Sequence, residues 1–218
     1  MEFHRQKDIF DPSKHKETIS LIGCGSVGSF SAIALSKMGC KLTDIYDSDT
    51  IESHNLPNQF YKINQLSLRK SKSLALLLND FSGEMPTPRD NLLEKELLNT
   101  DIVISAVDSM AARKLIWENV KASKKVRFYI DSRMGGRIFS LFSVDMKKQQ
   151  NIRDYETTLV DDSQTAELRC TERTIIFNVL GLASFICNSV SDFLNKKEIV
   201  NELHFDYSTF TICPMKWS

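Results

Sequence analysis

Short apolar runs alternate along the chain with segments in which hydrophobic residues recur every three or four positions. The runs predict strands, whereas the spaced segments have the period of amphipathic helices. The predicted strands cover residues 18–22, 41–46, 101–107, 126–131, 137–144 and 203–212. The predicted helices cover residues 29–38, 70–80, 109–122 and 171–194. This alternation is typical of a doubly wound, Rossmann-like α/β fold with a mainly parallel sheet and helices on both faces. The strands nearest the C-terminus are expected to join it antiparallel.

The segment at 145–169 differs from the rest of the chain. It is polar and charged, with little periodicity, and predicts a long loop. A loop of that length within a domain is usually functional or disordered. We expect one domain over residues 1–218, in four parts. These are a polar N-terminal arm at 1–17, a ligand-binding core at 18–144, the loop at 145–170, and a C-terminal helix and strand at 171–218.

The charges balance, with 28 Lys and Arg residues against 28 Asp and Glu residues. This argues against a general polyanion binder, so no nucleic-acid partner is expected, although it leaves room for a local basic pocket. The 5 cysteines contain no CxxC pair, so neither a disulfide framework nor a zinc site is predicted. The N-terminus lacks the apolar core of a secretory signal, and apolar stretches such as 175–179 are far shorter than the roughly 20 residues of a membrane-spanning helix. We therefore expect a cytoplasmic protein with no membrane partner.

The hexapeptide G23-C-G-S-V-G28 stands between a predicted strand and a predicted helix. In this GxGxxG pattern the first glycine allows a tight turn, the second lets the backbone approach a phosphate, and the third permits close contact between helix and strand. The helix N-terminus favours phosphate through its free N–H groups. The pattern predicts nucleotide binding by Gly23, Gly25, Ser26 and Gly28.

Two acids follow at the carboxyl ends of later predicted strands. Asp47 comes where a carboxylate can accept hydrogen bonds from a ribose, which suits a dinucleotide and a mononucleotide equally well. Asp108 follows the buried run at 103–107 and would face the same crevice. Mg²⁺ takes one or two carboxylates together with phosphate oxygens and water, so Asp108 is a candidate Mg²⁺ ligand. The competing interpretation is that Asp108 caps the next helix.

The glycine loop, the stretch D47-S-D-T-I-E-S-H-N-L-P-N-Q59 and the strand end D101-I-V-I-S-A-V-D108 together resemble the ThiF/MoeB family. These adenylating enzymes activate ubiquitin-like proteins and their relatives. The resemblance covers roughly residues 3–195, and the match at Asp47–Gln59 is its most specific part. It implies ATP and Mg²⁺ as cofactors and a homodimer.

The resemblance also implies roles for single residues. Asp47 would hold the ribose as the first of an acid pair with Asp49, and Asn55 and Gln59 would contact the triphosphate. Asp108 would bind Mg²⁺.

Two basic residues belong to the same implied site. Lys70 would contact phosphate, although Lys72 competes for that role and both fit an ordinary solvated helix. Arg5 would reach into the active site of a partner subunit, or else is a surface charge on the arm.

One position departs from the family pattern. Asn58 stands where the family has an arginine, which removes a cation that would counter the triphosphate charge. Loss of one charge from an electrostatic clamp weakens transition-state stabilisation. Arg113, Arg133 and Arg137 are candidates to replace it.

Cys170 precedes the last predicted helix, where some family members keep a cysteine for thioester or acyl-disulfide formation. Arg169, Arg173 and a helix N-terminus would lower the pKa of its thiol. The alternative is a structural cysteine.

The leading hypothesis is ATP-dependent adenylation of the C-terminal carboxylate of a ubiquitin-like or sulfur-carrier protein, followed in one version by transfer to Cys170. The polar loop at 145–170 is a candidate to cross over the glycine tail of that carrier. A second hypothesis is a catalytically weakened scaffold subunit, and a third is adenylation of a different carboxylate or of a peptide or tRNA substrate. An NAD-dependent oxidoreductase fits poorly, because it has no use for the stretch before Gln59 or for Asp108.

Overall fold

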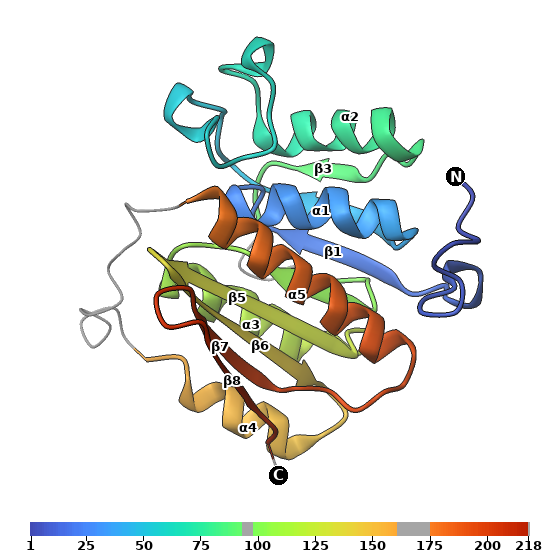
Figure 1. Cartoon of the computed structure of the whole chain (residues 1–218), viewed down its shortest axis with the longest axis vertical. Helices are drawn as coiled ribbons and strands as arrows, with labels where there is room; N and C mark the ends of the chain where they lie inside the picture. The colour runs from blue at the N-terminus through green and yellow to red at the C-terminus, as the bar shows by residue number, and fades with distance from the viewer. Residues whose placement is uncertain (93–97, 161–174, 218) are drawn as a thin grey trace.

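The computed structural model describes residues 1–92, 98–160 and 175–217. Within these residues eight strands form one sheet in the order β3-β2-β1-β4-β5-β6-β7-β8 (Figure 1). The strands are β1 Thr18–Ile22, β2 Lys41–Tyr46, β3 Thr87–Arg89, β4 Ile102–Ser105, β5 Phe128–Gly135, β6 Ile138–Asp145, β7 Glu202–Asp206 and β8 Thr211–Met215. The α-helices are α1 Ser26–Met38, α2 Lys70–Ser82, α3 Met110–Ala122, α4 Gln149–Thr157 and α5 Ile176–Leu194. Short 3₁₀ turns lie at Pro12–Lys14, Ser53–Asn55 and Ile63–Gln65.

The sheet has a parallel part and an antiparallel part. Strands β3, β2, β1, β4 and β5 pair in parallel, and β6, β7 and β8 continue the sheet antiparallel beyond β5. The predicted doubly wound fold with C-terminal antiparallel strands is therefore confirmed. From β1 the chain passes to β2 and β3 on one side of the sheet, and then crosses to β4 on the other side of β1. In such a sheet the ligand crevice lies at this switch point, outside the carboxyl ends of the strands.

Helices cover both faces of the sheet. On one face, α1 and α5 pack together over a core that contains Leu21, Leu35 and Ile186. On the other, α3 and α4 enclose a second core that includes Trp117 and Tyr155. Alternate residues of β4 enter opposite cores, which explains its nearly continuous apolar run.

The prediction of one loop over 145–169 is wrong for residues 149–157, which form α4. This helix is polar except on its inner side, where Tyr155 is fully buried against Trp117 and Tyr129. A short helix with so narrow an apolar face leaves little periodic signal in sequence. Residues 161–170 of the predicted loop and residues 171–174 of the predicted last helix lie outside the described part of the chain.

The single strand predicted over 203–212 is two strands, β7 and β8, joined by a turn. Asp206 makes the turn, because its carboxylate accepts hydrogen bonds from the Ser208 N–H and the Thr209 hydroxyl. The short edge strand β3 lies between the predicted helix at 70–80 and the predicted strand at 101–107 and was not predicted. Helix α1 begins at Ser26, three residues before the prediction.

Helix α5 is the one helix among the described residues that is long and apolar enough to cross a membrane by composition and length, with a mean hydropathy of 1.4. The expectation that no stretch approaches that length is therefore wrong for α5. Half of this span is buried inside the protein, and α5 packs on α1, β5 and β6. It is thus placed as a core helix of the sheet.

Candidate nucleotide-binding and active site

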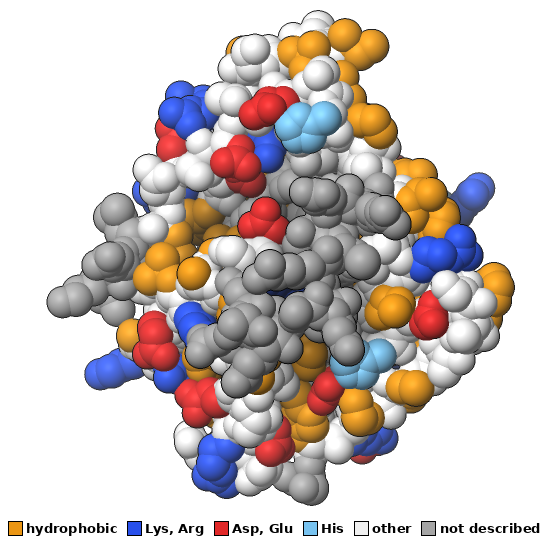
Figure 2. Space-filling model, turned by 90° about the vertical axis from the view of Figure 1, so that its left-hand side faces the viewer, with side chains coloured by type: hydrophobic (Ala, Val, Ile, Leu, Met, Phe, Trp, Pro, Cys, Tyr) orange, Lys and Arg blue, Asp and Glu red, His pale blue; other side chains and the backbone are white. Residues whose placement is uncertain are grey.

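A cavity of ≈ 1450 Å³ opens at the carboxyl ends of β1, β2, β4 and β5. Figure 2 looks onto this edge of the molecule and shows acidic and basic side chains intermixed among the side chains it colours. The glycine loop, the segment that follows β2 and the segment that follows β4 line one part of the cavity, and strands β5, β6 and β7 line the rest. Sequence positions predicted to bind nucleotide are therefore brought together, and the cavity continues beyond them.

The three glycines of the loop have different surroundings. Gly23 has a φ of +96°, and a Cβ there would lie 2.4 Å from the Ala106 carbonyl oxygen. A Cβ on Gly28 would lie 1.9 Å from the Gly23 carbonyl oxygen. Gly25 is the N-cap of α1, and the nearest atom to a Cβ there is Gln59 Nε2 at 4.0 Å. Gly23 and Gly28 thus serve packing, whereas Gly25 leaves open space at the N-terminus of α1.

Asp47 ties the glycine loop to the end of β2. Its Oδ2 accepts a hydrogen bond from the Cys24 N–H at 2.7 Å, and its Oδ1 accepts one from the Asp49 N–H at 2.8 Å. Burial raises the pKa of the Asp47 carboxyl, and these hydrogen bonds oppose the rise. Asp47 therefore positions the loop, and its predicted contact with a ribose stays a prediction.

Lys70 begins α2 and is buried, with its Nζ 2.9 Å from Asp49 Oδ2. The Lys70 N–H also donates to the Asp49 carbonyl, so both the backbone and the side chain hold the pair. Lys70 and Asp49 both line the cavity, whereas Lys72 is exposed and does not. The geometry favours Lys70 as the phosphate ligand, with Asp49 holding its ammonium in place.

Three amides from the Asp47–Gln59 stretch line the cavity: Asn55, Asn58 and Gln59. The side chain of Asn55 accepts the Glu52 N–H at 2.9 Å and so shapes the 3₁₀ turn. The buried side-chain oxygen of Gln59 has no hydrogen-bond partner within the described residues. A buried amide without a partner beside the open Gly25 is what a polar ligand would satisfy.

These residues fit ATP. The open N-terminus of α1 and the Lys70 ammonium suit phosphates, and the buried side-chain oxygen of Gln59 is left without a partner among the described residues. When bound, Mg²⁺ would neutralise phosphate charge, and Asp108 is the residue that would hold it.

Asp108 is exposed in the cavity, three residues after the end of β4 at Ser105. It does not cap α3, because the N-cap is Ser109, whose side chain accepts the Ala112 N–H at 3.2 Å. The capping interpretation is therefore wrong, and the carboxylate is left facing the cavity. In the described part of the chain no three His, Cys, Asp or Glu side chains gather around one point. A metal held by Asp108 would need phosphate oxygens and water as further ligands.

Two of the three candidate arginines line the cavity, and both are held by one buried acid. Asp131 accepts from Arg113 Nε at 3.0 Å and from Arg133 Nε at 2.7 Å. Arg113 also donates to the Val107 and Ser132 carbonyl oxygens. Burial lowers the pKa of Arg133, but Asp131 and Tyr155 raise it by more.

Arg137 is exposed outside this cavity lining, where it donates to the Tyr207 carbonyl. Arg113 and Arg133 therefore bring positive charge to the cavity that Asn58 also lines, and Asp131 neutralises part of that charge.

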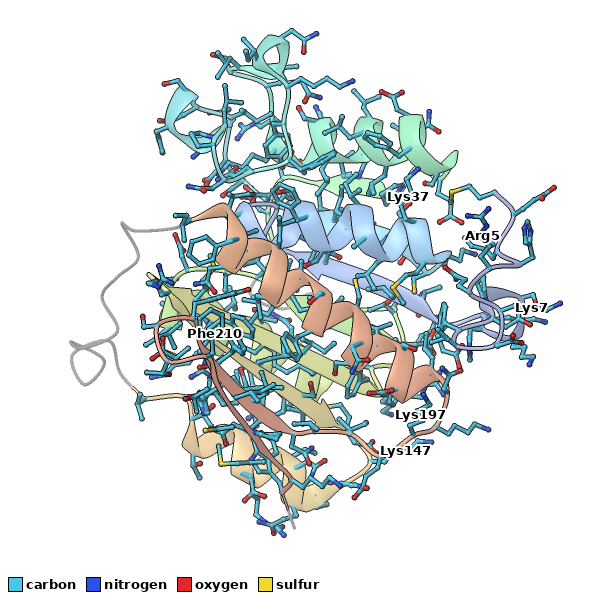
Figure 3. All side chains as sticks on the ribbon, in the orientation of Figure 1. Arg5, Lys7, Lys37, Lys147, Lys197 and Phe210 are labelled. Carbon is cyan, nitrogen blue, oxygen red and sulfur yellow. The ribbon has the colours of Figure 1, made fainter. Side chains whose placement is uncertain are left out.

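Arg5 lies on the N-terminal arm, at the opposite end of the molecule from the carboxyl edge of the sheet (Figure 3). It is exposed and takes no part in the cavity of its own chain.

Cys170 lies outside the described residues. Cys24, Cys40 and Cys187 are buried, whereas Cys213 is exposed on β8.

The prediction missed the contribution of β6 and β7 to the cavity, through residues that include Ser140 and His204. The available signal was the period-two pattern E202-L-H-F-D206, which places polar side chains on one face of a strand. With 203–212 taken as one uninterrupted strand, nothing indicated which face met the ligand crevice.

A doubly wound sheet with a glycine loop at its switch point defines a nucleotide-binding α/β protein. The model of the ThiF family matches residues 13–216, and the chain belongs to that family. It is 28% identical over 172 residues to the SUMO-activating enzyme subunit uba-2 of Caenorhabditis elegans, which covers 73% of this chain and 29% of the relative. It is 24% identical over 133 residues to ubiquitin-like modifier-activating enzyme 5 of Branchiostoma floridae, covering 53% of this chain and 32% of the relative. The chain therefore spans about a third of the length of these curated relatives.

Solved structures share the fold. The crystal structure of E. coli MccB with ATP superimposes with a TM-score of 0.74 at 16% identity, over 95% of this chain and 66% of that chain. The crystal structure of PaaA gives a TM-score of 0.71 at 11% identity, over 95% of this chain and 65% of that chain. At these identities the likeness establishes the fold alone.

Proposed function

We propose that this protein uses Mg²⁺-ATP to adenylate a carboxylate. The observation that carries the proposal is the joining, in one cavity, of the open helix N-terminus at Gly25, the buried Lys70 and the exposed Asp108. Membership of the ThiF family and a relative solved with ATP support the nucleotide. Two relatives named as activating enzymes for SUMO and for a ubiquitin-like modifier support a ubiquitin-like or sulfur-carrier protein with a glycine tail as the substrate.

In the proposed reaction a carboxylate oxygen attacks the α-phosphorus of ATP, and pyrophosphate leaves with the electron pair of the broken P–O bond. The substrate carboxylate is already ionised at neutral pH, so no base is required. The residues of this chain act by positioning the reactants and balancing charge. The α1 N-terminus, Lys70 and Gln59 would hold the phosphates, Asp47 would orient the ribose, and Asp108 would hold the cation.

A scaffold role is the second candidate, and Asn58 is the observation that favours it. Without that arginine, the arginines that line the cavity are Arg113 and Arg133, and Asp131 neutralises part of their charge. A subunit that retains ATP binding but contributes weakly to chemistry would show this pattern.

The position of Arg5 on the N-terminal arm is the reason to expect a homodimer. Because Arg5 lies at the opposite end from the cavity of its own chain, it could serve only the cavity of another copy (Figure 3). Later transfer of the acyl group to Cys170 is part of the same proposal.

The test is the substitution Asp108→Ala in an ATP–pyrophosphate exchange assay with candidate carrier proteins and Mg²⁺. We expect a loss of about 10²-fold or more, because the metal would lose its protein ligand. Asp80→Ala is the matched control, since Asp80 is an exposed acid on α2 outside the cavity. Retained exchange in Asp108→Ala would overturn the assignment of the metal to this residue.

A further inference from the structure

Strands β6 and β7 carry a hydrogen-bonded chain of a hydroxyl, an imidazole and a carboxylate. Ser140 Oγ lies 2.7 Å from His204 Nδ1, and His204 Nε2 lies 2.7 Å from Glu202 Oε1. Ser140 and His204 are directly paired across the two strands, and Glu202 is two residues before His204. All three side chains therefore lie on the same face of the sheet.

The partners of His204 fix the role of each ring nitrogen. A carboxylate accepts hydrogen bonds, so Nε2 carries the proton and donates it to Glu202. In the tautomer that carries its proton on Nε2, Nδ1 accepts a hydrogen bond from the Ser140 hydroxyl. This is the arrangement of a nucleophile, a base and an orienting acid, which is recognised by geometry and not by fold.

The surroundings hold the carboxylate and the ring in place. Trp217 Nε1 donates to Glu202 Oε2 at 3.2 Å, so both oxygens of Glu202 are bound. The ring of Phe142 stands edge-on to His204, with centroids 6.1 Å apart at 84°. The guanidinium carbon of Arg133 lies 4.3 Å from the centroid of the same Phe142 ring. A cation on this face would stabilise negative charge that develops near Ser140.

Ser140 and His204 line the same cavity as the glycine loop, Lys70 and Asp108. At ≈ 1450 Å³ it exceeds the roughly 300–1,000 Å³ typical of a small-molecule site. It has room for a nucleotide at one end and the end of a polypeptide or other acyl chain at the other.

We propose that Ser140 is a second catalytic nucleophile, which takes the acyl group from the acyl-adenylate. This inference rests on the proposed function. Ser140 Oγ attacks the acyl carbonyl carbon and gives its proton to His204 Nδ1. The bond from that carbon to the AMP oxygen breaks, and AMP leaves with the electron pair. The product is an acyl ester of Ser140, and Glu202 is a positioning residue that stabilises the protonated His204.

The first test needs no ATP. A fluorophosphonate probe reacts with activated serines, because the serine oxygen attacks phosphorus and fluoride leaves. We expect mass spectrometry to find the probe on Ser140 of the full chain, with labelling slowed about 10²-fold or more in His204→Asn. Glu202→Gln should slow labelling less and shift its pH profile. Ser184→Ala is the control, since that exposed serine on α5 bonds only within its own helix.

No labelling of Ser140, or equal labelling in the wild type and His204→Asn, would overturn the activated serine. Either result leaves ATP–pyrophosphate exchange untouched, so it is distinguishable from failure of the proposed function.

The second test follows the acyl group after adenylation of a carrier that supports exchange. We expect AMP release and an acyl ester mapped to Ser140, and we expect that ester to persist in Cys170→Ala. Accumulation of the acyl-adenylate with Ser140 unmodified would overturn the proposal, and so would an adduct found on Cys170 alone.

Discussion

At the scale of single residues, the glycines of the loop differ in whether they serve the packing of the fold or the binding of a ligand. Gly23 and Gly28 are packed so closely that a methyl group at either would meet a backbone carbonyl oxygen. Gly25 has no such neighbour and stands at the open N-terminus of α1. The glycines of the GxGxxG pattern therefore have two different roles: Gly23 and Gly28 allow close packing, and Gly25 leaves space for a ligand.

Substitution by alanine should expose that difference. We expect Gly28→Ala to destabilise the protein by roughly 1–3 kcal/mol or more, because its Cβ would lie 1.9 Å from the Gly23 carbonyl oxygen. Gly25→Ala should leave the free energy of unfolding nearly unchanged but weaken ATP binding, because its methyl group would occupy the phosphate position. Urea unfolding and ATP titration calorimetry measure the two effects. Equal loss of stability in both variants would contradict this division.

Lys70 and Lys72 provide a second matched pair. We expect Lys70→Met to lower ATP–pyrophosphate exchange about 10²-fold and Lys72→Met to leave it unchanged, since Lys70 alone of the two faces the cavity. Lys70→Met should change stability by less than about 1 kcal/mol, because Asp49 is 66% exposed and water screens the pair. A larger effect from Lys72→Met would reverse the assignment.

At the scale of elements, an acidic cluster joins the amino ends of β1 and β4 to the start of β5. Asp101 Oδ2 accepts from the Thr18 N–H and hydroxyl, each at 3.0 Å, and Arg127 bridges Asp101 and Glu17. Burial alone would raise the pKa of Asp101, but the Thr18 hydrogen bonds and the charge of Arg127 lower it overall. The pKa of Glu17 is lowered in the same way, against the effect of burial.

This cluster should stabilise the protein in a pH-dependent manner. Because the folded pKa values lie below the unfolded ones, the stabilisation is present above about pH 4 and is lost as the pH falls through the folded values. We expect the free energy of unfolding to fall with acidification, and to fall less steeply in Asp101→Asn. Urea unfolding from pH 6 to pH 3 measures this, with Asp80→Asn as control. Parallel curves for wild type and Asp101→Asn would exclude the cluster as a source of the effect.

Elements with strong periodicity could be predicted from sequence, and those made by local or tertiary contacts could not. Strands β1 and β2 and helix α3 match their predicted ranges within a residue or two. Helix α4 escaped because most of its residues are polar and its packing depends on Tyr155 entering a cluster built by distant aromatic residues. The β7–β8 hairpin was not predicted, because Asp206 stabilises its turn through side-chain hydrogen bonds that do not appear in a period-two pattern of hydrophobic residues.

The candidate site likewise contains residues that could be predicted from the sequence and residues that could not. Asp47, Lys70 and Asp108 were predicted from family motifs, and all three line one cavity. Their spacing relative to the parallel strands can be recognised in the sequence. Ser140 and His204 lie 64 positions apart and meet only through the register of β6 and β7. That register depends on the whole antiparallel extension, which no local pattern specifies.

At the scale of the whole molecule, one sheet supplies two halves of a single cavity. The parallel strands bring the glycine loop and Asp108 to their carboxyl ends, and the antiparallel strands extend the wall with Ser140 and His204. Both halves therefore line the cavity in which the proposed reaction between ATP and a carboxylate would take place.

The most direct test of this account is ATP–pyrophosphate exchange by the unaltered protein, with Mg²⁺ and a panel of carboxylates. The panel contains ubiquitin-like and sulfur-carrier proteins with glycine tails and short peptides with free C-termini. We predict exchange with at least one of them, abolished when its C-terminal carboxylate is amidated. ATP binding without exchange across the panel would contradict adenylation and favour the scaffold role.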